Sequence, residues 1–183
     1  MSGKDHGMMS LAATHVAPIF LLLIVAMYGC GYHFSPGGEH IDQTIQRVFV
    51  EKFDNYTSEA DLENYVQSAF INEIIQGGRF DMAGSKEGAD AVVSGKILRS
   101  DVSHLSYTDV DVAKENRVTV TMEITFKELR TGQIIWNNNA LTEREAFVVA
   151  GDPSRTEANR KNALIKLVKD MAERAHRSIM SGF

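Results

Sequence analysis

The chain has 183 residues, 44% of them hydrophobic, and a formal net charge of −5 at pH 7. The leader charges Lys4 and Asp5 cancel, so the rest of the chain carries the whole net charge. This composition argues against a global basic field for binding nucleic acid. The single cysteine allows no internal disulfide, so we expect the domain to be held by its hydrophobic core alone.

The N-terminal segment has the pattern of an export signal. Residues 16–28 form a nearly continuous apolar run behind a polar leader, and His15 and Pro18 interrupt its front. The run is shorter than the roughly 20 residues that a comfortable bilayer span needs. We therefore interpret it as a signal segment followed by a processing site. Three start residues remain open: Met1, Met8 and Met9.

A cysteine directly behind the apolar run indicates which kind of signal this is. Met27, Tyr28, Gly29 and Cys30 resemble a bacterial lipobox, although Tyr28 is bulky for its place. The resemblance implies cleavage between Gly29 and Cys30 and a covalent lipid on Cys30, an attachment that several acyl chains make effectively permanent. Gly31 follows where many inner-membrane lipoproteins carry Asp, which favours the outer membrane. The alternative is an uncleaved membrane anchor with an incidental cysteine.

These features divide the chain into three parts. We predict a lipoprotein signal peptide over 1–29, a lipidated tether over 30–44 that contains a Ser-Pro-Gly-Gly loop, and a single periplasmic α/β domain over 45–183. At roughly 3.3 to 3.6 Å per extended residue, the tether reaches a few tens of ångströms at most. The domain would therefore stay close to the periplasmic face of the membrane.

The first half of the domain has the pattern of a strand, a helix and a second strand. Residues 47–53 are rich in β-branched and aromatic residues. Ser58 and Asp61 resemble a capping box, and apolar residues then recur at helical spacing up to Gly77 and Gly78. Residues 89–98 are predicted as the second strand, with Gly95 as a bulge or a close approach. A right-handed crossover would set these two strands parallel.

The second half predicts an antiparallel hairpin and a long helix. Apolar and polar residues alternate strictly over 118–126, as in a strand with one buried face. A turn over 130–133, with Gly132 suited to a positive φ, leads into a strand over 134–136. Asp152 and Pro153 then form an N-cap and first-turn pair before a helix with a long apolar stripe.

The element order therefore predicts an α/β (α+β) two-layer sandwich. We expect a mixed four-stranded sheet with two helices packed on one face, in the order β-α-β-β-β-α. The other face carries threonines on the third strand and the Trp-Asn-Asn-Asn run of 136–139. This polar face suits hydrogen-bonded contact with another wall, or it is simply solvated. The pattern does not decide between the two.

Three motifs resemble the LptE family of lipopolysaccharide-assembly lipoproteins. They are the Cys-Gly-Tyr-His-Phe of 30–34, the Ala-Asp-Ala strand of 89–97 and the Thr-Gly hairpin ending in Trp over 129–136. The resemblance implies a non-enzymatic outer-membrane protein that sits in the lumen of a large β-barrel, LptD, as a plug. It also implies help in folding that barrel and in delivering lipopolysaccharide, with no nucleic acid partner.

Lipopolysaccharide contact would require cations against phosphates. We name Lys114, Arg117 and Arg130 as candidate contacts, with solvated charges as the plain alternative. Catalysis finds little support, because the histidines behind the signal segment, His33, His40, His104 and His176, are scattered and no metal-ligand spacing appears. We expect no catalytic residue, no metal and no cofactor beyond the lipid. A polar cluster of His104 with Asp101 and Asp109 is a minor candidate.

A different class of function stays open. Residues 48–55 also resemble the first strand of lipoproteins that activate peptidoglycan synthases or multimerise as secretion channels. The short tether argues against the synthase, because reaching it from the outer membrane favours a long linker. An anchored hydrolase would need a buried polar constellation that the sequence does not display.

Overall fold

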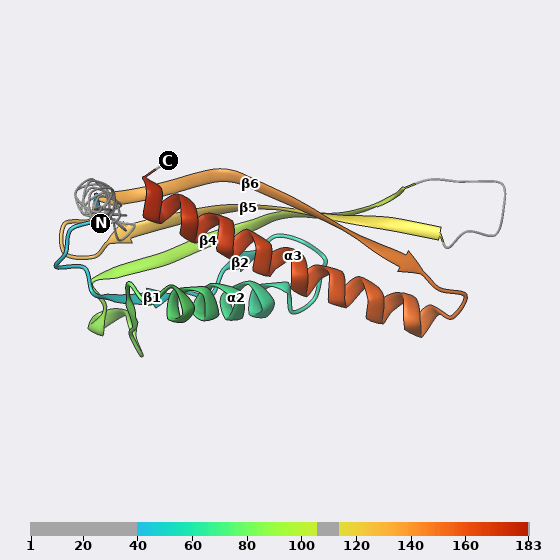
Figure 1. Cartoon of the computed structure of the whole chain (residues 1–183), viewed down its shortest axis with the longest axis horizontal. Coiled ribbons are helices and arrows are strands. Elements are labelled where there is room, and N and C mark those ends of the chain that lie inside the picture. Colours follow the sequence, from blue (N-terminus) through green and yellow to red (C-terminus); the bar gives the residue numbers. More distant parts are fainter. Residues whose placement is uncertain (1–39, 106–113, 183) are drawn as a thin grey trace, which may run out of the picture. The chain divides into compact units, whose positions relative to one another are not determined.

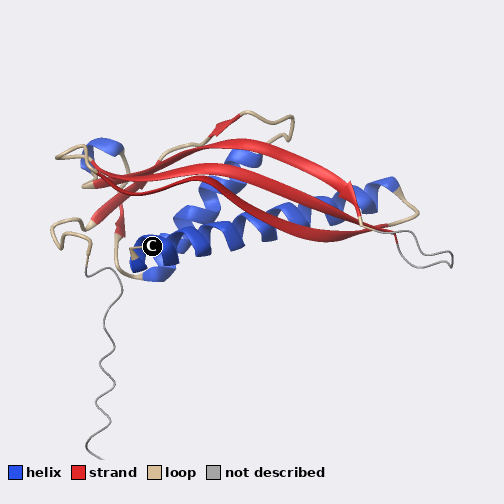
Figure 2. Cartoon of the chain, turned by 90° about the horizontal axis from the view of Figure 1, so that it is seen from above, coloured by secondary structure: helices blue, strands red, loops and turns tan. Residues whose placement is uncertain are grey.

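The computed structural model describes residues 40–105 and 114–182. Over these residues the chain forms one mixed sheet and two α-helices that lie against it (Figure 1, Figure 2). The elements in chain order are β1 (Arg47–Val50), β2 (Asp54–Asn55), α2 (Leu62–Gly77), β3 (Asp81–Met82), the 3-10 turn η1 (Lys86–Gly88), β4 (Ala91–His104), β5 (Lys114–Glu128), β6 (Ile134–Val149) and α3 (Pro153–Ser181). Neither described helix is long and apolar enough to cross a membrane.

The α+β class is confirmed, but the predicted count of four strands is wrong. The described sheet has six strands in the order β3-β1-β4-β5-β6, with β2 beside β4. The two additional strands, β2 and β3, are two residues long each, too short to show any periodicity. β1 is parallel to β4, as the crossover predicted, and β4, β5 and β6 are antiparallel.

The helix ends agree with the sequence except at the start of α2. Its N-cap is Asp61, with a left-handed φ of 62° and no capping hydrogen bond from its side chain, so the predicted Ser58–Asp61 capping box is wrong. α2 ends at Gly77, and its C-cap residue Gly78 has a φ of +64°. At the start of α3, the Asp152 carboxylate accepts the N–H groups of Ser154 and Arg155, and Pro153 occupies the first turn as predicted.

The core lies between the sheet and the two helices. The even-numbered residues of β5 from Val118 to Phe126 are almost fully buried there, together with the apolar stripes of α2 and α3. A Cβ on Gly95 would lie 2.2 Å from the Glu123 carbonyl oxygen and 2.6 Å from the Phe53 ring. The close approach predicted at Gly95 is therefore confirmed, whereas the bulge of β4 lies between Ile97 and Arg99.

Candidate functional site

The open face of the sheet, defined by the residues that alternate with the buried ones on β4, β5 and β6, is mainly polar. Thr121 lies opposite Thr142, and their hydroxyl oxygens are 2.9 Å apart. Thr125 lies opposite Asn137, and the Asn137 amide donates to Asn139 at 3.0 Å. Hydroxyl and amide groups can donate and accept, so this face can form hydrogen bonds with a polar wall as readily as with water.

The charges on the open face are unevenly compensated. Lys96 lies 3.4 Å from Glu123, and Arg99 lies 3.6 Å from Asp101. Arg144 is paired with Thr119, and Arg117 is paired with Ala146, which makes the two arginines diagonal neighbours on β5 and β6. Within residues 40–105 and 114–182, neither Arg117 nor Arg144 has a carboxylate within ion-pair distance.

The candidate lipopolysaccharide contacts lie at the two ends of β5. Arg117 is near its start, and Lys114 is its first residue, whose side chain lies outside what the structure describes. Arg130 lies in the turn after β5, where its guanidinium is 3.0 Å from Glu128. At about 3.3 Å per residue, the strand from Arg117 to Glu128 is roughly 36 Å long. One phosphate group therefore cannot contact both Arg117 and Arg130.

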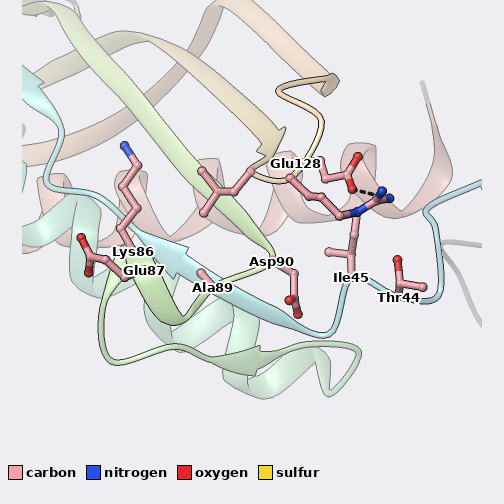
Figure 3. Close-up of a pocket in the computed structure, with 9 residues that line it drawn as sticks. Thr44, Ile45, Lys86, Glu87, Ala89, Asp90 and Glu128 are labelled. Atoms are coloured by element: carbon pink, nitrogen blue, oxygen red, sulfur yellow. Dashed lines mark ion pairs between the residues drawn. The ribbon is translucent and has the colours of Figure 1, made fainter.

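A hollow of about 610 Å³ lies at the Arg130 end of the sheet (Figure 3). Asp90 accepts the backbone N–H groups of Arg47 and Gln46 at 2.8 and 3.1 Å, and these bonds, first that of Arg47, lower the pKa of its carboxyl group. Glu128, 7% exposed, accepts from the Thr131 hydroxyl in addition to its ion pair with Arg130. The carboxylates of Asp90 and Glu128 are thus satisfied by their own chain, which indicates a role in holding the turn and β1.

Comparison with known proteins identifies the family. The model of the LptE family, described as lipopolysaccharide-assembly, matches residues 45–181. The chain belongs to the LptE family. Its membership makes it an LptE-like envelope lipoprotein. No curated protein matches the chain.

Solved structures resemble this LptE-family chain in fold. A Xanthomonas campestris protein superposes with a TM-score of 0.52 and 9% identity, over 75% of this chain and 85% of the other. A minor lipoprotein of Acinetobacter baumannii gives a TM-score of 0.43 and 14% identity, over 75% and 92%. Lipoprotein B of Nitrosomonas europaea gives 0.45 and 12%, over 75% and 83%. The first of these similarities shows the fold; at such identities none shows a function.

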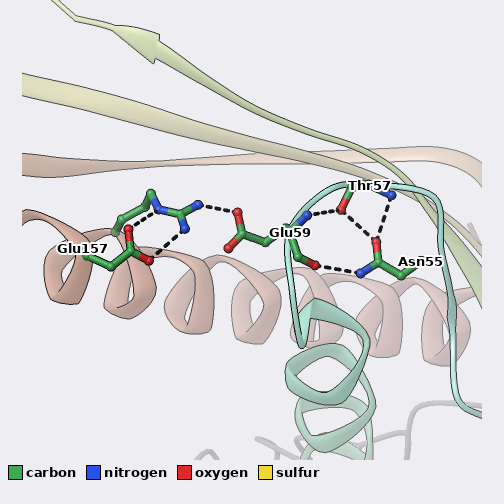
Figure 4. Close-up of polar contacts among 5 residues, drawn as sticks. Asn55, Thr57, Glu59 and Glu157 are labelled. Carbon is green, nitrogen blue, oxygen red and sulfur yellow. Dashed lines mark hydrogen bonds and ion pairs between the residues drawn. The ribbon is translucent and has the colours of Figure 1, made fainter.

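A second polar network joins the loop after β2 to α3 (Figure 4). Arg160 donates two hydrogen bonds to Glu157, at 3.0 and 2.8 Å, and one to Glu59. These bonds, first to Glu157 and then to Glu59, raise the pKa of Arg160 above its ordinary value. Asn55 donates to the Glu59 carbonyl at 2.8 Å, and the Glu59 N–H donates to Thr57. The network fixes the loop that leads into α2, and no periodic pattern of residues predicts it.

The predicted polar cluster around His104 is not formed by the described residues. His104 lies 2.8 Å from the Asn116 amide oxygen, whereas Asp101 belongs to the opposite face of β4. Asp109 lies outside the described residues, as do Gly29 and Cys30. No group of three His, Cys, Asp or Glu side chains in residues 40–105 and 114–182 is placed to hold a metal ion.

His176 is a half-buried titratable group that sequence reasoning did not single out. It lies between α3 and α2, with Nδ1 3.4 Å from Glu73 and Nε2 without a partner among the described residues. A Cβ on Gly77 would lie 2.5 Å from its ring. Burial lowers the pKa of His176, and Glu73 partly opposes that shift. The ring packs between the two helices, where burial favours its neutral form.

Proposed function

We propose that this chain is a non-enzymatic outer-membrane lipoprotein that plugs an LptD-type β-barrel, helps that barrel to assemble and assists lipopolysaccharide insertion into the outer leaflet. In this proposal cleavage between Gly29 and Cys30 and a lipid on Cys30 place it on the periplasmic face of the outer membrane. Membership of the LptE family supports the partner and the process. The single structural observation that favours the plug is the open, polar face of the sheet.

The polar face suits the proposed environment for a physical reason. A barrel too wide to be filled by its own side chains has an aqueous lumen with polar walls. A threonine and asparagine surface exchanges its bonds with water for bonds with such a wall at little net cost, each bond contributing about 1 kcal/mol. Arg117 and Arg144, which have no carboxylate within ion-pair distance among the described residues, add positive charge that acidic groups on the wall would match.

Lipopolysaccharide contact remains part of the proposal, and its three candidate residues lie in two separate places. Lys114 and Arg117 belong to one end of β5 and Arg130 to the other, so they should be neutralised in two separate variants. The triple variant should weaken lipopolysaccharide binding while barrel association is retained. The Lys114→Ala/Arg117→Ala variant and Arg130→Ala alone then show which end carries the effect, and unchanged binding in the triple variant would discard all three residues.

The competing proposal is a lipoprotein regulator of a peptidoglycan synthase or of another envelope machine. The resemblance of residues 48–55 to such proteins motivates it. In the structure this stretch includes most of β1, which lies inside the sheet between β3 and β4, where only a small part of the strand is accessible. A regulatory surface would therefore have to lie elsewhere on the domain, and no described contact favours a particular place.

A pull-down of the full-length tagged chain from outer membranes in mild detergent tests the proposal. We expect one large β-barrel to be retained at stoichiometric level, identified by mass spectrometry, and we expect protease to leave the domain uncut in that complex. Recovery of a peptidoglycan synthase would favour the competing proposal. Recovery of no partner, from membranes in which the barrel is detected, would contradict the plug.

A further inference from the structure

The outer edge of β6 is regular over its second half, residues 141–149. β6 is the last strand of the described sheet, with β5 on its one paired side. Residues 141–149 pair with residues 114–122 of β5 without a bulge, and this stretch contains no proline. Proteins usually blunt such an edge with a bulge, a proline or a covering segment, because its free N–H and C=O groups can pair with another strand.

Two hydrogen bonds establish which backbone groups point outward. The Glu115 carbonyl accepts from Leu105 on the β4 side at 2.9 Å, so the backbone of Glu115 is turned away from β6. Its partner Val148 is therefore turned away from β5. The Asn159 amide of α3 donates to the Val148 carbonyl at 2.9 Å, which confirms that this carbonyl points away from β5. By alternation, the backbone groups of Thr142, Arg144 and Ala146 also point outward.

A groove accompanies this edge. A hollow of about 300 Å³ separates Ala146 and Val148 of β6 from Asn159, Asn162, Ala163 and Lys166 of α3. The N-terminal turns of α3 close its far end, where Thr156 and Asn159 bond to Ala150 and Val148. The small Ala146 and Ala163 leave space, and the Asn162 amide can donate and accept. An exposed strand edge beside a helix is the arrangement in which extended peptides add to a sheet.

We infer that the outer edge of β6 binds an extended strand of the protein partner, through backbone hydrogen bonds to Arg144, Ala146 and Val148 and a carboxylate beside Arg144. Arg144 supplies the charge complementarity. It lies exposed on the open face, with no carboxylate within ion-pair distance among the described residues. A strand added to β6 places its own side chains beside that guanidinium, within cross-strand contact.

A second copy of this chain fits the edge less well. The carboxylates of β6, Glu143 and Glu145, face α3 and are bonded to Arg174 and Lys166 at 2.5 and 2.6 Å. The open-face residues of residues 141–149 are Thr142, Arg144, Ala146 and Val148, none of which is acidic. Pairing of two copies would therefore leave both Arg144 side chains without a counter-charge.

The inference rests on the proposed function for the identity of the partner, and its test separates the two. The full-length chain is co-purified with the LptD-type barrel, and backbone hydrogen exchange is compared with that of the chain alone. The N–H groups of Arg144, Ala146 and Val148 should become protected at least about tenfold in the complex. The N–H groups of the neighbouring odd residues, already bonded to β5, should change little.

Substitutions provide the matched controls. Ala146→Pro removes one outward N–H without touching a bond to β5, a change that edge strands tolerate, and should reduce barrel retention at least about tenfold. Ala146→Val keeps the N–H and should retain the barrel. Arg144→Glu should weaken retention several-fold, whereas Arg99→Glu, on the same face but on an inner strand, should have little effect. Circular dichroism of each variant verifies that it is folded.

The exchange and retention measurements together support or overturn strand addition at β6. Protection of the outward amides together with loss in Ala146→Pro supports strand addition. A barrel that binds wild type and Ala146→Pro equally, with the outward amides unprotected, overturns the inference and leaves the proposed function standing. Protection that appears without the barrel, together with a dimer in solution, makes β6 a self-interface and overturns it too. If wild type retains no barrel, the proposed function fails and this inference fails with it.

Discussion

The two faces of β5 differ in composition and in their surroundings: the helices cover one face, and the other face is open. Val118, Val120 and Met122 lie on the covered face, fully buried under the helices. Thr119 and Thr121 alternate with them on the open face and remain partly exposed. The same strand therefore contributes most of its stabilising burial on one side and keeps the other side available for a partner. Substitutions on the two faces should accordingly affect different measurements.

The largest effect should follow from a cavity on the covered face. Met122→Ala removes a fully buried side chain and should lower the free energy of unfolding by about 2–5 kcal/mol. Urea unfolding of the full chain in detergent, followed by circular dichroism, measures the change. A loss below about 1 kcal/mol would mean that the covered face is not the core of the domain.

A smaller loss should follow from overfilling the same face. Gly95→Ala places a methyl group 2.2 Å from the Glu123 carbonyl oxygen and against Phe53, and should cost about 1–3 kcal/mol. Gly84→Ala is the matched control, because a Cβ there meets no atom within 4 Å. Equal stability of the two variants would contradict the close approach of β4, β5 and Phe53.

The pH dependence of stability tests the covered side of the sheet in another way, because His176 lies between the two helices that cover it. Its pKa in the folded chain is lowered, first by burial, so the unfolded chain binds the proton more readily. The stabilisation is therefore present above the unfolded pKa of about 6.5 and is lost as pH falls through that value toward the folded pKa. Unfolding measured between about pH 7 and pH 5 should show this loss, which His176→Gln should reduce.

A control for this pH effect uses the neighbouring carboxylate. Glu73→Gln removes the group that opposes the shift, so the loss of stability on acidification should become steeper than in wild type. An unchanged slope in both His176→Gln and Glu73→Gln would show that other groups cause the pH dependence.

The smallest effect on stability should come from the open face. Thr121→Val with Thr142→Val removes a partly exposed hydroxyl pair and should change the free energy of unfolding by less than about 1 kcal/mol. The same double variant should reduce retention of the barrel in the pull-down if the open face is the docking face. A loss as large as that of Met122→Ala would erase the distinction between the faces.

Much of the fold followed from local patterns in the sequence. The alternation over 118–126 predicted β5 and its buried face, and the Asp152–Pro153 pair predicted the start of α3. Gly132 has the positive φ, 75°, that the hairpin turn required. These signals are strong because each depends on the conformation of a few neighbouring residues.

The strand lengths were predicted poorly. β6 was expected over three residues and has 16, because its polar residues form a strand through pairing with β5 and carry little hydrophobic alternation of their own. β4 and β5 likewise extend beyond their predicted ends, to His104 and back to Lys114. β1 is shorter than expected and ends at Val50. Pairing between distant segments, which no local window contains, sets these lengths.

The sequence by itself determined the class of the fold, the polar character of one sheet face and the resemblance to the LptE family, because each depends on residue type and short spacing. Only the tertiary structure decided that Arg117 and Arg130 lie at opposite ends of β5, and that Arg144 lies beside Arg117 on β6, the edge strand of the described sheet. Strand register brings these residues together or apart, and register depends on long-range pairing and packing that a single sequence does not display.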